Sequence, residues 1–206
     1  MKSSRLTLIL LMLLSLPLAC PGGEHDGPRP VNFDIEWGTM CNVYRFHHFY
    51  YIPDEGGVVF DTKLDYPFLF TGQILFGAEF NILKWLSAGV HTGYYGIYEG
   101  RAVIPVLARV NFYPWGKQKK TLYMYGDGGL TFGLQEFHRG SMYHAGGAFR
   151  VPIGNGMNID FKLAGRLCHD HPDIKNPDKE GIIPPDRVRS SQVLMIGAEF
   201  SVGISF

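Results

Sequence analysis

The amino-acid sequence predicts an all-β fold in which eight antiparallel strands follow one another in up-and-down order and close into a transmembrane β-barrel. Three observations predict it. Apolar and polar residues alternate with a period of two along most of the chain after residue 30, as in strands with two different faces. No stretch there keeps the 3.6-residue period of an amphipathic helix over three turns. Short and long connections alternate between the strands, which is typical of a barrel that crosses a membrane.

The eight expected strands are separated by segments rich in glycine, proline and polar residues. They cover residues 31–38, 68–80, 85–95, 102–113, 121–134, 142–151, 157–168 and 191–206. The last strand shows the pattern most clearly, because bulky apolar side chains alternate there with small or polar ones. Its apolar positions are Leu194, Ile196, Ala198, Phe200, Val202, Ile204 and Phe206. Each strand is therefore expected to present one apolar and one polar face.

The connections and the aromatic residues suggest how the barrel sits in a membrane. Short turns are expected at 81–84, 114–120 and 152–156, intermediate ones at 96–100 and 135–141, and long loops at 45–65 and 169–190. Short turns belong to the periplasmic side of such barrels and long loops to the outside. Aromatic side chains favour the headgroup layer, so two girdles are expected. One contains Phe33, Phe80, Trp85, Tyr113, Trp115 and Phe206, and the other Tyr44, Tyr66, Tyr94, Phe137 and Tyr143.

The polar face of the strands holds glycines and charged residues, which fits a narrow lumen better than a water-exposed surface. The apolar face is bulky and nearly free of charge over about ten residues per strand, the length that spans a bilayer when tilted. We therefore expect lipid outside and a network of charge pairs in the lumen. Its expected members are Asp34, Glu36, Glu79, His91, Arg109, Asp127, Asp160, Lys162, Arg166 and Glu199. A secreted soluble barrel, similar to a lipocalin, is the alternative.

The N-terminus resembles a secretory signal peptide. Two positive charges in residues 1–5 precede a 13-residue apolar run, and small or turn-forming residues follow. We expect a signal peptide at about 1–22, a short linker at 23–30 and the barrel domain at 31–206. A retained anchor and lipidation of Cys20 are alternatives, although Pro17 stands where a lipoprotein signal usually has an aliphatic residue. Cys41 and Cys168 are too few for a disulfide-stapled fold, and their pairing is left open.

The C-terminal residues 197–206, with the sequence GAEFSVGISF, resemble the last strand of the small outer-membrane barrels of the OmpA/OmpX type. Segments 78–85 and 104–114 resemble strand-and-turn pieces of the same family. The resemblance covers about residues 31–206 and implies an integral bacterial outer-membrane protein. It also implies that Phe200, Val202, Ile204 and Phe206 form the signal that the outer-membrane assembly machinery reads.

Nothing in the sequence indicates catalysis. Some barrels of this size modify lipids, but the His-x-Ser pair of the lipid A deacylases is absent, and residues 138–141 have a different spacing. An acyltransferase or hydrolase acting on lipid A remains the less favoured alternative. The cluster of Cys168, His169 and His171 has no second ligand pair at a fixed spacing. We therefore expect no enzyme, no cofactor and no metal site.

Charge and loops set the expectations for partners. The 19 basic and 19 acidic residues cancel, and no basic run occurs, so we expect no nucleic-acid partner. The expected partners are outer-membrane lipid, the assembly machinery and an extracellular ligand at loops 45–65 and 169–190. We expect a monomer with a structural role or an interaction role through these loops, its lumen closed by charge pairs. A small pore or transporter is the alternative.

Overall fold

The computed structural model describes residues 30–53, 55–98, 101–116, 120–134, 139–154, 156–176 and 181–206. The expected signal peptide, the linker apart from its last residue, Cys20 and Phe137 lie outside the described residues.

The described chain is almost entirely β-strand. In chain order the strands are β1 (Val31–Tyr51), β2 (Val59–Asp65), β3 (Leu69–Leu83), β4 (Leu86–Tyr98), β5 (Arg101–Phe112), β6 (Thr121–Gly133), β7 (Arg139–Gly154), β8 (Met157–Asp170) and β9 (Val188–Ser205). One turn of 3-10 helix, η2 (Pro185–Arg187), precedes β9. Among the residues described, no helix is long and apolar enough to cross a membrane, a finding that does not bear on crossing by strands.

The predicted fold class is confirmed: eight antiparallel strands close into a barrel. β1 pairs with β3, and each strand from β3 to β8 pairs with the strand that follows it. β9 then pairs back with β1, which closes the barrel and leaves β2 outside it. The closing ladder continues to the end of the chain, where the backbones of Phe33 and Phe206 exchange two hydrogen bonds of 3.0 and 2.9 Å. Closure satisfies the backbone groups that an open sheet edge would leave unpaired.

Strand β5 shows why the sequence folds into two-faced strands. Its side chains alternate strictly between buried and exposed from Val103 to Phe112. The buried positions include Arg109 and Asn111, and the exposed ones carry Ile104, Val106, Ala108, Val110 and Phe112. Pro105 lacks a backbone N–H and occupies a position where β5 makes no pair with β4. The outward side chains from Ile104 to Phe112 are all apolar, whereas the inward face is apolar from Val103 to Leu107 and polar at Arg109 and Asn111.

The prediction of a long loop at 45–65 is wrong, because this segment continues the sheet. β1 runs on to Tyr51, and β2 folds back antiparallel to it. Val59 pairs with Tyr51 at one end of this ladder, and Asp65 pairs with Arg45 at the other. The turn between them contains Gly56 and Gly57 at φ of 83° and 88°, a conformation that favours glycine. The outer part of β9, which begins at Val188 rather than at 191, pairs with the other side of β1.

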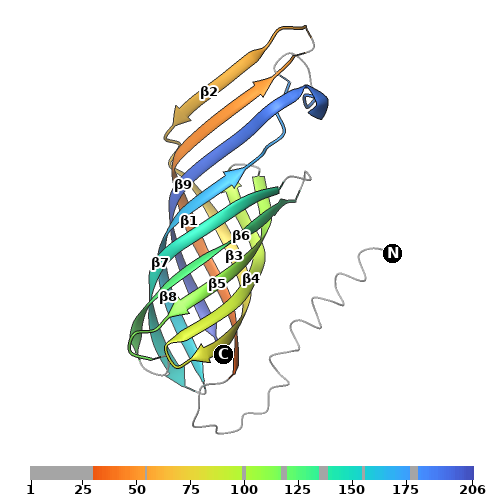
Figure 1. Cartoon of the computed structure of the whole chain (residues 1–206). Coiled ribbons are helices and arrows are strands. Elements are labelled where there is room, and N and C mark those ends of the chain that lie inside the picture. The colour runs from red at the N-terminus through yellow and green to blue at the C-terminus, as the bar shows by residue number, and fades with distance from the viewer. Residues whose placement is uncertain are drawn as a thin grey trace, which may run out of the picture.

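These three strands form an extension beyond one end of the barrel, shown at the top of Figure 1. A register shift between Asn42 and Tyr44 marks the change from barrel to extension. The bulge moves Tyr44 to the outward side, opposite Ile196. The extension's outer face is therefore continuous with the outer surface of the barrel.

The segment 169–190 is also more ordered in structure than a free loop. His169 and Asp170 belong to β8, and Lys175 and Ile182 form an isolated β-bridge. The side chains of Ile174 and Ile183 are buried against Tyr51. The segment expected as a long loop instead packs, through Ile174 and Ile183, on the inner face of the extension.

The remaining connections are short at both ends of the barrel. β4 ends at Tyr98 and β5 begins at Arg101, so the intermediate loop expected at 96–100 is shorter than predicted. At the opposite end, where the C-terminus lies in Figure 1, Trp85 and Trp115 are exposed. Tyr113 was expected in that girdle but is fully buried inside the barrel against Tyr123. The side chains of Asn111, Phe112 and Tyr113 point inward, outward and inward in turn, so Tyr113 continues the alternation of β5.

Candidate functional site

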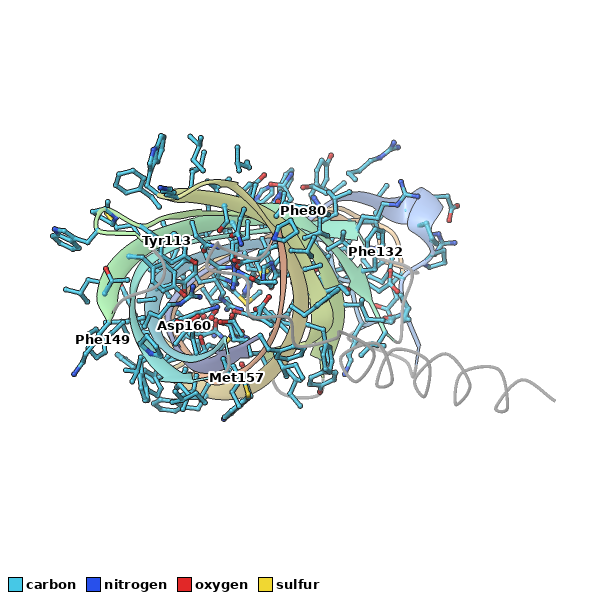
Figure 2. All side chains as sticks on the ribbon, turned by 90° about the horizontal axis from the view of Figure 1, so that it is seen from below. Phe80, Tyr113, Phe132, Phe149, Met157 and Asp160 are labelled. Carbon is cyan, nitrogen blue, oxygen red and sulfur yellow. The ribbon has the colours of Figure 1, made fainter. Side chains whose placement is uncertain are left out.

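The barrel interior is the candidate site, because it gathers most of the buried ionisable groups of the described chain. All ten residues expected in the lumen are at most 7% exposed. Figure 2 looks along the barrel and shows Asp160 inside the ring of strands and Phe149 outside it. Each of these charged groups needs a partner, because an isolated buried charge is strongly unfavourable.

Glu36 is the centre of the ionic network. Its carboxylate accepts hydrogen bonds from Arg109 Nη1 at 2.7 Å, Lys162 Nζ at 2.6 Å and Ser201 Oγ at 2.6 Å. The Arg109 guanidinium also donates to Asp127, on the neighbouring strand, at 2.8 Å. Five strands are joined in this way: β1, β5, β6, β8 and β9.

A second branch leads from Asp127 to Glu199 through His144. The His144 Nδ1 contacts Asp127, and its Nε2 lies 3.4 Å from the Glu199 carboxylate. Glu199 also accepts hydrogen bonds from Tyr95 Oη at 2.5 Å and Gln73 Nε2 at 2.6 Å. The expected network omitted His144, Tyr95 and Gln73, although His144 and Gln73 stand on the polar face that the alternation predicts.

The end of the barrel near the C-terminus contains a separate ion pair. Arg150 donates to both oxygens of Asp160, at 2.8 and 2.6 Å. Its guanidinium lies over the rings of Tyr113 and Tyr123, 5.0 and 5.3 Å from their centroids. The guanidinium is thus stabilised by a bidentate pair and by two aromatic faces. Arg150 was not among the expected members of the lumen network, although it stands between the apolar residues Phe149 and Val151 and therefore on the polar face of its strand.

Arg166 does not join the ladder of charge pairs expected for it. Its guanidinium donates to the amide oxygen of Asn42 and lies 5.5 Å from the centroid of the Tyr95 ring. Two of its nitrogens, Nε and Nη1, are buried without a hydrogen-bond partner, and within the described chain it forms no ion pair. Asp170, the nearest acidic residue along β8, is instead paired with Arg101 at 2.8 Å.

The half of the interior toward the extension is apolar, which the expectation of a purely polar lumen did not include. Ten buried side chains pack there: Met40, Leu75, Tyr95, Ile97, Val103, Leu107, Met142, Cys168, Val193 and Met195. Cys168 fills space in this cluster as a free thiol, and Cys41 is also free. The interior therefore has an ionic part around Glu36 and a mainly apolar part toward the extension, where Arg166 lies over the Tyr95 ring and Asp170 pairs with Arg101.

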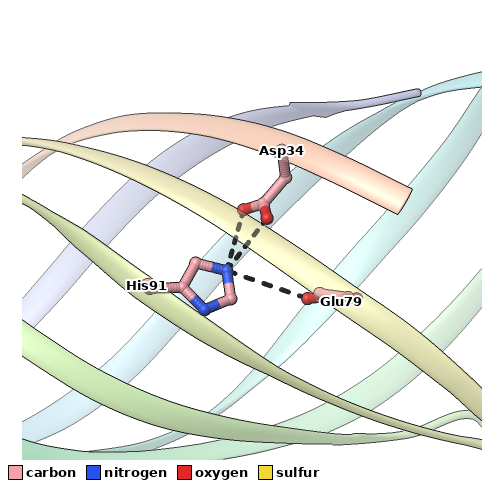
Figure 3. Close-up of side chains that lie close together, drawn as sticks. All are labelled: Asp34, Glu79 and His91. Atoms are coloured by element: carbon pink, nitrogen blue, oxygen red, sulfur yellow. Dashed lines mark hydrogen bonds and ion pairs between the residues drawn. The ribbon is translucent and has the colours of Figure 1, made fainter. Parts of the chain in front are cut away.

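A third group of charged residues joins β1, β3 and β4. His91 Nε2 lies 2.9 and 3.0 Å from the two oxygens of Asp34 and 3.9 Å from Glu79 Oε1 (Figure 3). Glu79 accepts hydrogen bonds from Asn111 at 2.7 Å and Ser87 at 3.3 Å. All three chemical groups are buried.

The extension has an ion pair of its own, outside the barrel. Arg45 donates to both oxygens of Asp65, at 2.9 and 2.5 Å, across the β1–β2 ladder. These hydrogen bonds hold the pKa of Asp65 below its usual value. A depressed pKa contributes stability above the unfolded value, about 3.9, and that contribution is lost as the pH falls through the folded value.

Asp65→Asn is therefore expected to loosen the β1–β2 pairing at neutral pH and to have no effect in acid. Because the pair is partly exposed, amide exchange in the hairpin should rise by no more than about fivefold at pH 7. The difference between variant and wild type should shrink as the pH falls through the lowered pKa of Asp65, and vanish once Asp65 is protonated in both the folded and the opened state. Hydrogen exchange with mass spectrometry measures both conditions, and a difference that persists in acid would contradict the assignment.

Comparisons with known proteins give a structural neighbour and no family. No protein-family model matches the chain, and no curated protein matches it. Among solved structures, the outer membrane protein OprG from Pseudomonas aeruginosa is similar over 85% of this chain and 97% of its own, with 12% sequence identity and a TM-score of 0.43. At this identity and this TM-score the match identifies neither a family nor a function.

Proposed function

We propose that the chain is an integral, non-enzymatic β-barrel protein of the bacterial outer membrane, whose lumen is closed and whose extension provides an interaction surface. One observation carries the proposal: the polarity of the barrel is the reverse of that of a soluble protein. Thirty-six large hydrophobic side chains of the described residues are exposed, whereas the buried set includes the six carboxylate side chains of the lumen network. Soluble monomers rarely expose apolar surface of that extent.

The outer surface has the length and chemistry of a lipid-facing belt. On β5 the outward positions from Ile104 to Phe112 are all apolar and cover nine residues, which matches a strand that crosses a bilayer at a tilt. On β9 the outward Ile196 and Phe200 continue the belt. A soluble barrel would need these side chains inside and the charged residues outside.

The location in the outer membrane is supported by the two ends of the sequence. The N-terminal charge and apolar run resemble a signal for export. The final strand, which ends in Phe206, resembles that of OmpA/OmpX-type barrels, whose last strand is read by the assembly machinery. Its apolar positions Phe200, Val202 and Ile204 face away from the buried Glu199, Ser201 and Ser205.

Two features support a closed lumen. Eight strands leave an interior that side chains alone can fill. Here the ionic network around Glu36 and Arg109 occupies one half, and the cluster with Leu75 and Leu107 occupies the other. Ions crossing the barrel would have to break the first and enter the second. We therefore expect little conductance in planar bilayers, and steady single-channel currents would favour the small pore or transporter instead.

The extension is the surface we propose for contacts outside the membrane. Its outer face carries Tyr50 stacked on Phe60, with ring centroids 4.3 Å apart, and Tyr44 edge-on to Tyr66. Phe60 is 67% exposed. Within the described residues β2 pairs only with β1, so its other edge presents free backbone donors and acceptors. An extracellular ligand that adds a strand there is compatible with both features.

Heat-modifiable migration tests the membrane assignment. Outer-membrane and periplasmic fractions are run on a gel with and without boiling, because a closed barrel resists unfolding by detergent at room temperature. We expect the protein in the outer-membrane fraction, with a different migration of the unboiled band. A periplasmic protein that runs identically in both states would overturn the assignment and make a soluble ligand-binding barrel the leading hypothesis.

A further inference from the structure

Asp34, Glu79 and His91 come together because of the register of three neighbouring strands. Asp34 on β1 pairs with Gly77 on β3, and Gly77 pairs with His91 on β4. Asp34, Gly77 and His91 therefore form one row across the sheet, and Glu79 occupies the next inward position after Gly77 on β3. Figure 3 shows the imidazole facing both carboxylates. Asp34 and His91 are 57 residues apart in sequence, so no spacing motif indicates the site.

Gly77 creates the space in which these groups meet. A Cβ at this position would lie 2.2 Å from Asp34 Oδ1 and 2.2 Å from His91 Nε2, closer than real contacts allow. Any other residue would therefore push Asp34 and His91 apart. The missing side chain lets the donor atoms of the two outer strands approach across the middle one.

The donor atoms have the spacing of a metal site. One atom from each of Asp34, Glu79 and His91 can be chosen so that all lie within 4.8 Å of one another. A tetrahedral ion with bonds of about 2.0 to 2.1 Å requires its donors to lie about 3.3 Å apart. The observed separations from His91 Nε2, 2.9 Å to Asp34 and 3.9 Å to Glu79, fall on either side of that value.

The charge balance at this position differs from that of most other carboxylates in the ionic network. Glu36, Asp127 and Asp160 each contact an arginine or lysine. Among the described residues no arginine or lysine lies within ion-pair distance of Asp34, Glu79 or Glu199. Glu199 faces His144, whereas Asp34 and Glu79 share the imidazole of His91. Metal ligands must be deprotonated, and as ligands two carboxylates and one neutral imidazole together carry two negative charges, which one divalent cation neutralises.

We propose that Asp34, Glu79 and His91 bind one divalent transition-metal ion of the zinc type, which ties β1, β3 and β4 together. An imidazole with two carboxylates suits zinc, and a set without nitrogen would suit magnesium or calcium. Asn111 donates to Oε1 of Glu79 and Ser87 donates to Oε2, so both orient the carboxylate, as partners of metal ligands commonly do. Three protein donors leave a fourth position for water. The site departs from the sequence-based expectation of no metal.

The test uses the full protein extracted from membranes, unfolded in denaturant with a chelator and refolded in detergent with zinc. After removal of free metal, the bound zinc is counted by elemental analysis. We expect about one zinc per wild-type chain and at least a tenfold lower content in His91→Ala. The matched control is the double variant His169→Ala with His171→Ala. It removes two imidazoles that lie outside the Asp34, Glu79 and His91 group and whose ring centroids are 4.5 Å apart. This control should keep its zinc.

Three results would overturn the proposal: wild type without zinc, zinc unaffected by His91→Ala, or zinc lost in the His169/His171 control. Glu79→Gln, which keeps the size of the side chain, serves as a second variant, and unboiled gel migration shows whether each variant folds. Should both variants fail to fold, X-ray absorption of zinc-loaded wild type decides. One imidazole with oxygen donors at about 2.0 Å supports the site, and two imidazoles or a sulfur ligand contradict it.

Discussion

Arg109→Met is expected to lower the free energy of unfolding of the barrel by about 3 to 5 kcal/mol, the usual cost of breaking a buried ion pair by removing one partner. Arg109 is 1% exposed and donates to two carboxylates, Glu36 and Asp127. Methionine fills much of the same volume but leaves Asp127 with His144 alone and Glu36 with Lys162 and hydroxyl or amide donors. The uncompensated negative charge would then be buried between β1 and β6.

Arg166→Met is the matched control for this substitution. Arg166 is 2% exposed, so both substitutions remove an equally buried guanidinium. Among the described residues its guanidinium contacts the Asn42 amide and the Tyr95 ring, and two of its nitrogens have no hydrogen-bond partner. Removing a poorly paired buried charge costs little or even stabilises. The loss in free energy of unfolding, measured by denaturant titration in lipid, should therefore be larger for Arg109→Met than for Arg166→Met by at least about 2 kcal/mol. Equal losses would contradict the network described for Arg109.

The Arg109 substitution is not expected to open a conducting path. The apolar cluster containing Leu75, Leu107 and Met142 lies above the ionic network and remains intact. Hydrated ions would still have to enter an apolar region, which is unfavourable. We therefore expect low bilayer conductance in the variant as in wild type, with the loss confined to stability.

The faces of the strands could be predicted from the sequence because each strand separates two different environments. From Arg109 to Phe112 of β5 and from Gly197 to Ser205 of β9, apolar residues alternate with small or polar ones, so one apolar residue fixes the side of the others. The alternation is not informative where both neighbours are apolar. Ile74, Leu75 and Phe76 are consecutive apolar residues, and the sequence alone does not indicate that Leu75 points inward. The apolar half of the interior was missed for this reason.

The extension could not be predicted from periodicity. From Tyr44 to Tyr51 aromatic, basic and histidine residues occur on both faces, so neither face has a clear polarity. The bulge next to Val43 also reverses the alternation established by the preceding residues. The strand partner, β2, is short and mostly exposed, without an apolar face of its own.

Membership of the lumen followed from the alternation, but the pairings required the register between strands. Arg109 stands directly opposite Asp127 in the β5–β6 ladder, a relation that depends on the length of the turn between them. Glu36 meets Lys162 across 126 residues of sequence, and only closure of the barrel brings them together. The Asp34, Glu79 and His91 group likewise depends on two successive registers.

Val106→Arg is expected to destabilise the folded protein by about 2 to 4 kcal/mol, as arginine does on the lipid face of a barrel near the bilayer midplane. Val106 lies near the middle of β5, faces outward and is 44% exposed. In a soluble barrel an arginine at such a position would be solvated, and the change would be nearly neutral. In a bilayer the guanidinium must either remain in hydrocarbon or draw water and headgroups toward it.

Val58→Arg separates this lipid effect from the intrinsic effect of the substitution. Val58 immediately precedes β2 in the extension and is 53% exposed, so the same change occurs at similar exposure outside the expected belt. Refolding yield and denaturant stability in lipid vesicles should fall for Val106→Arg and stay within about 0.5 kcal/mol of wild type for Val58→Arg. If both variants behave like wild type, the apolar surface of β5 does not face lipid. In water an arginine would be solvated at either position, and neither substitution would be costly.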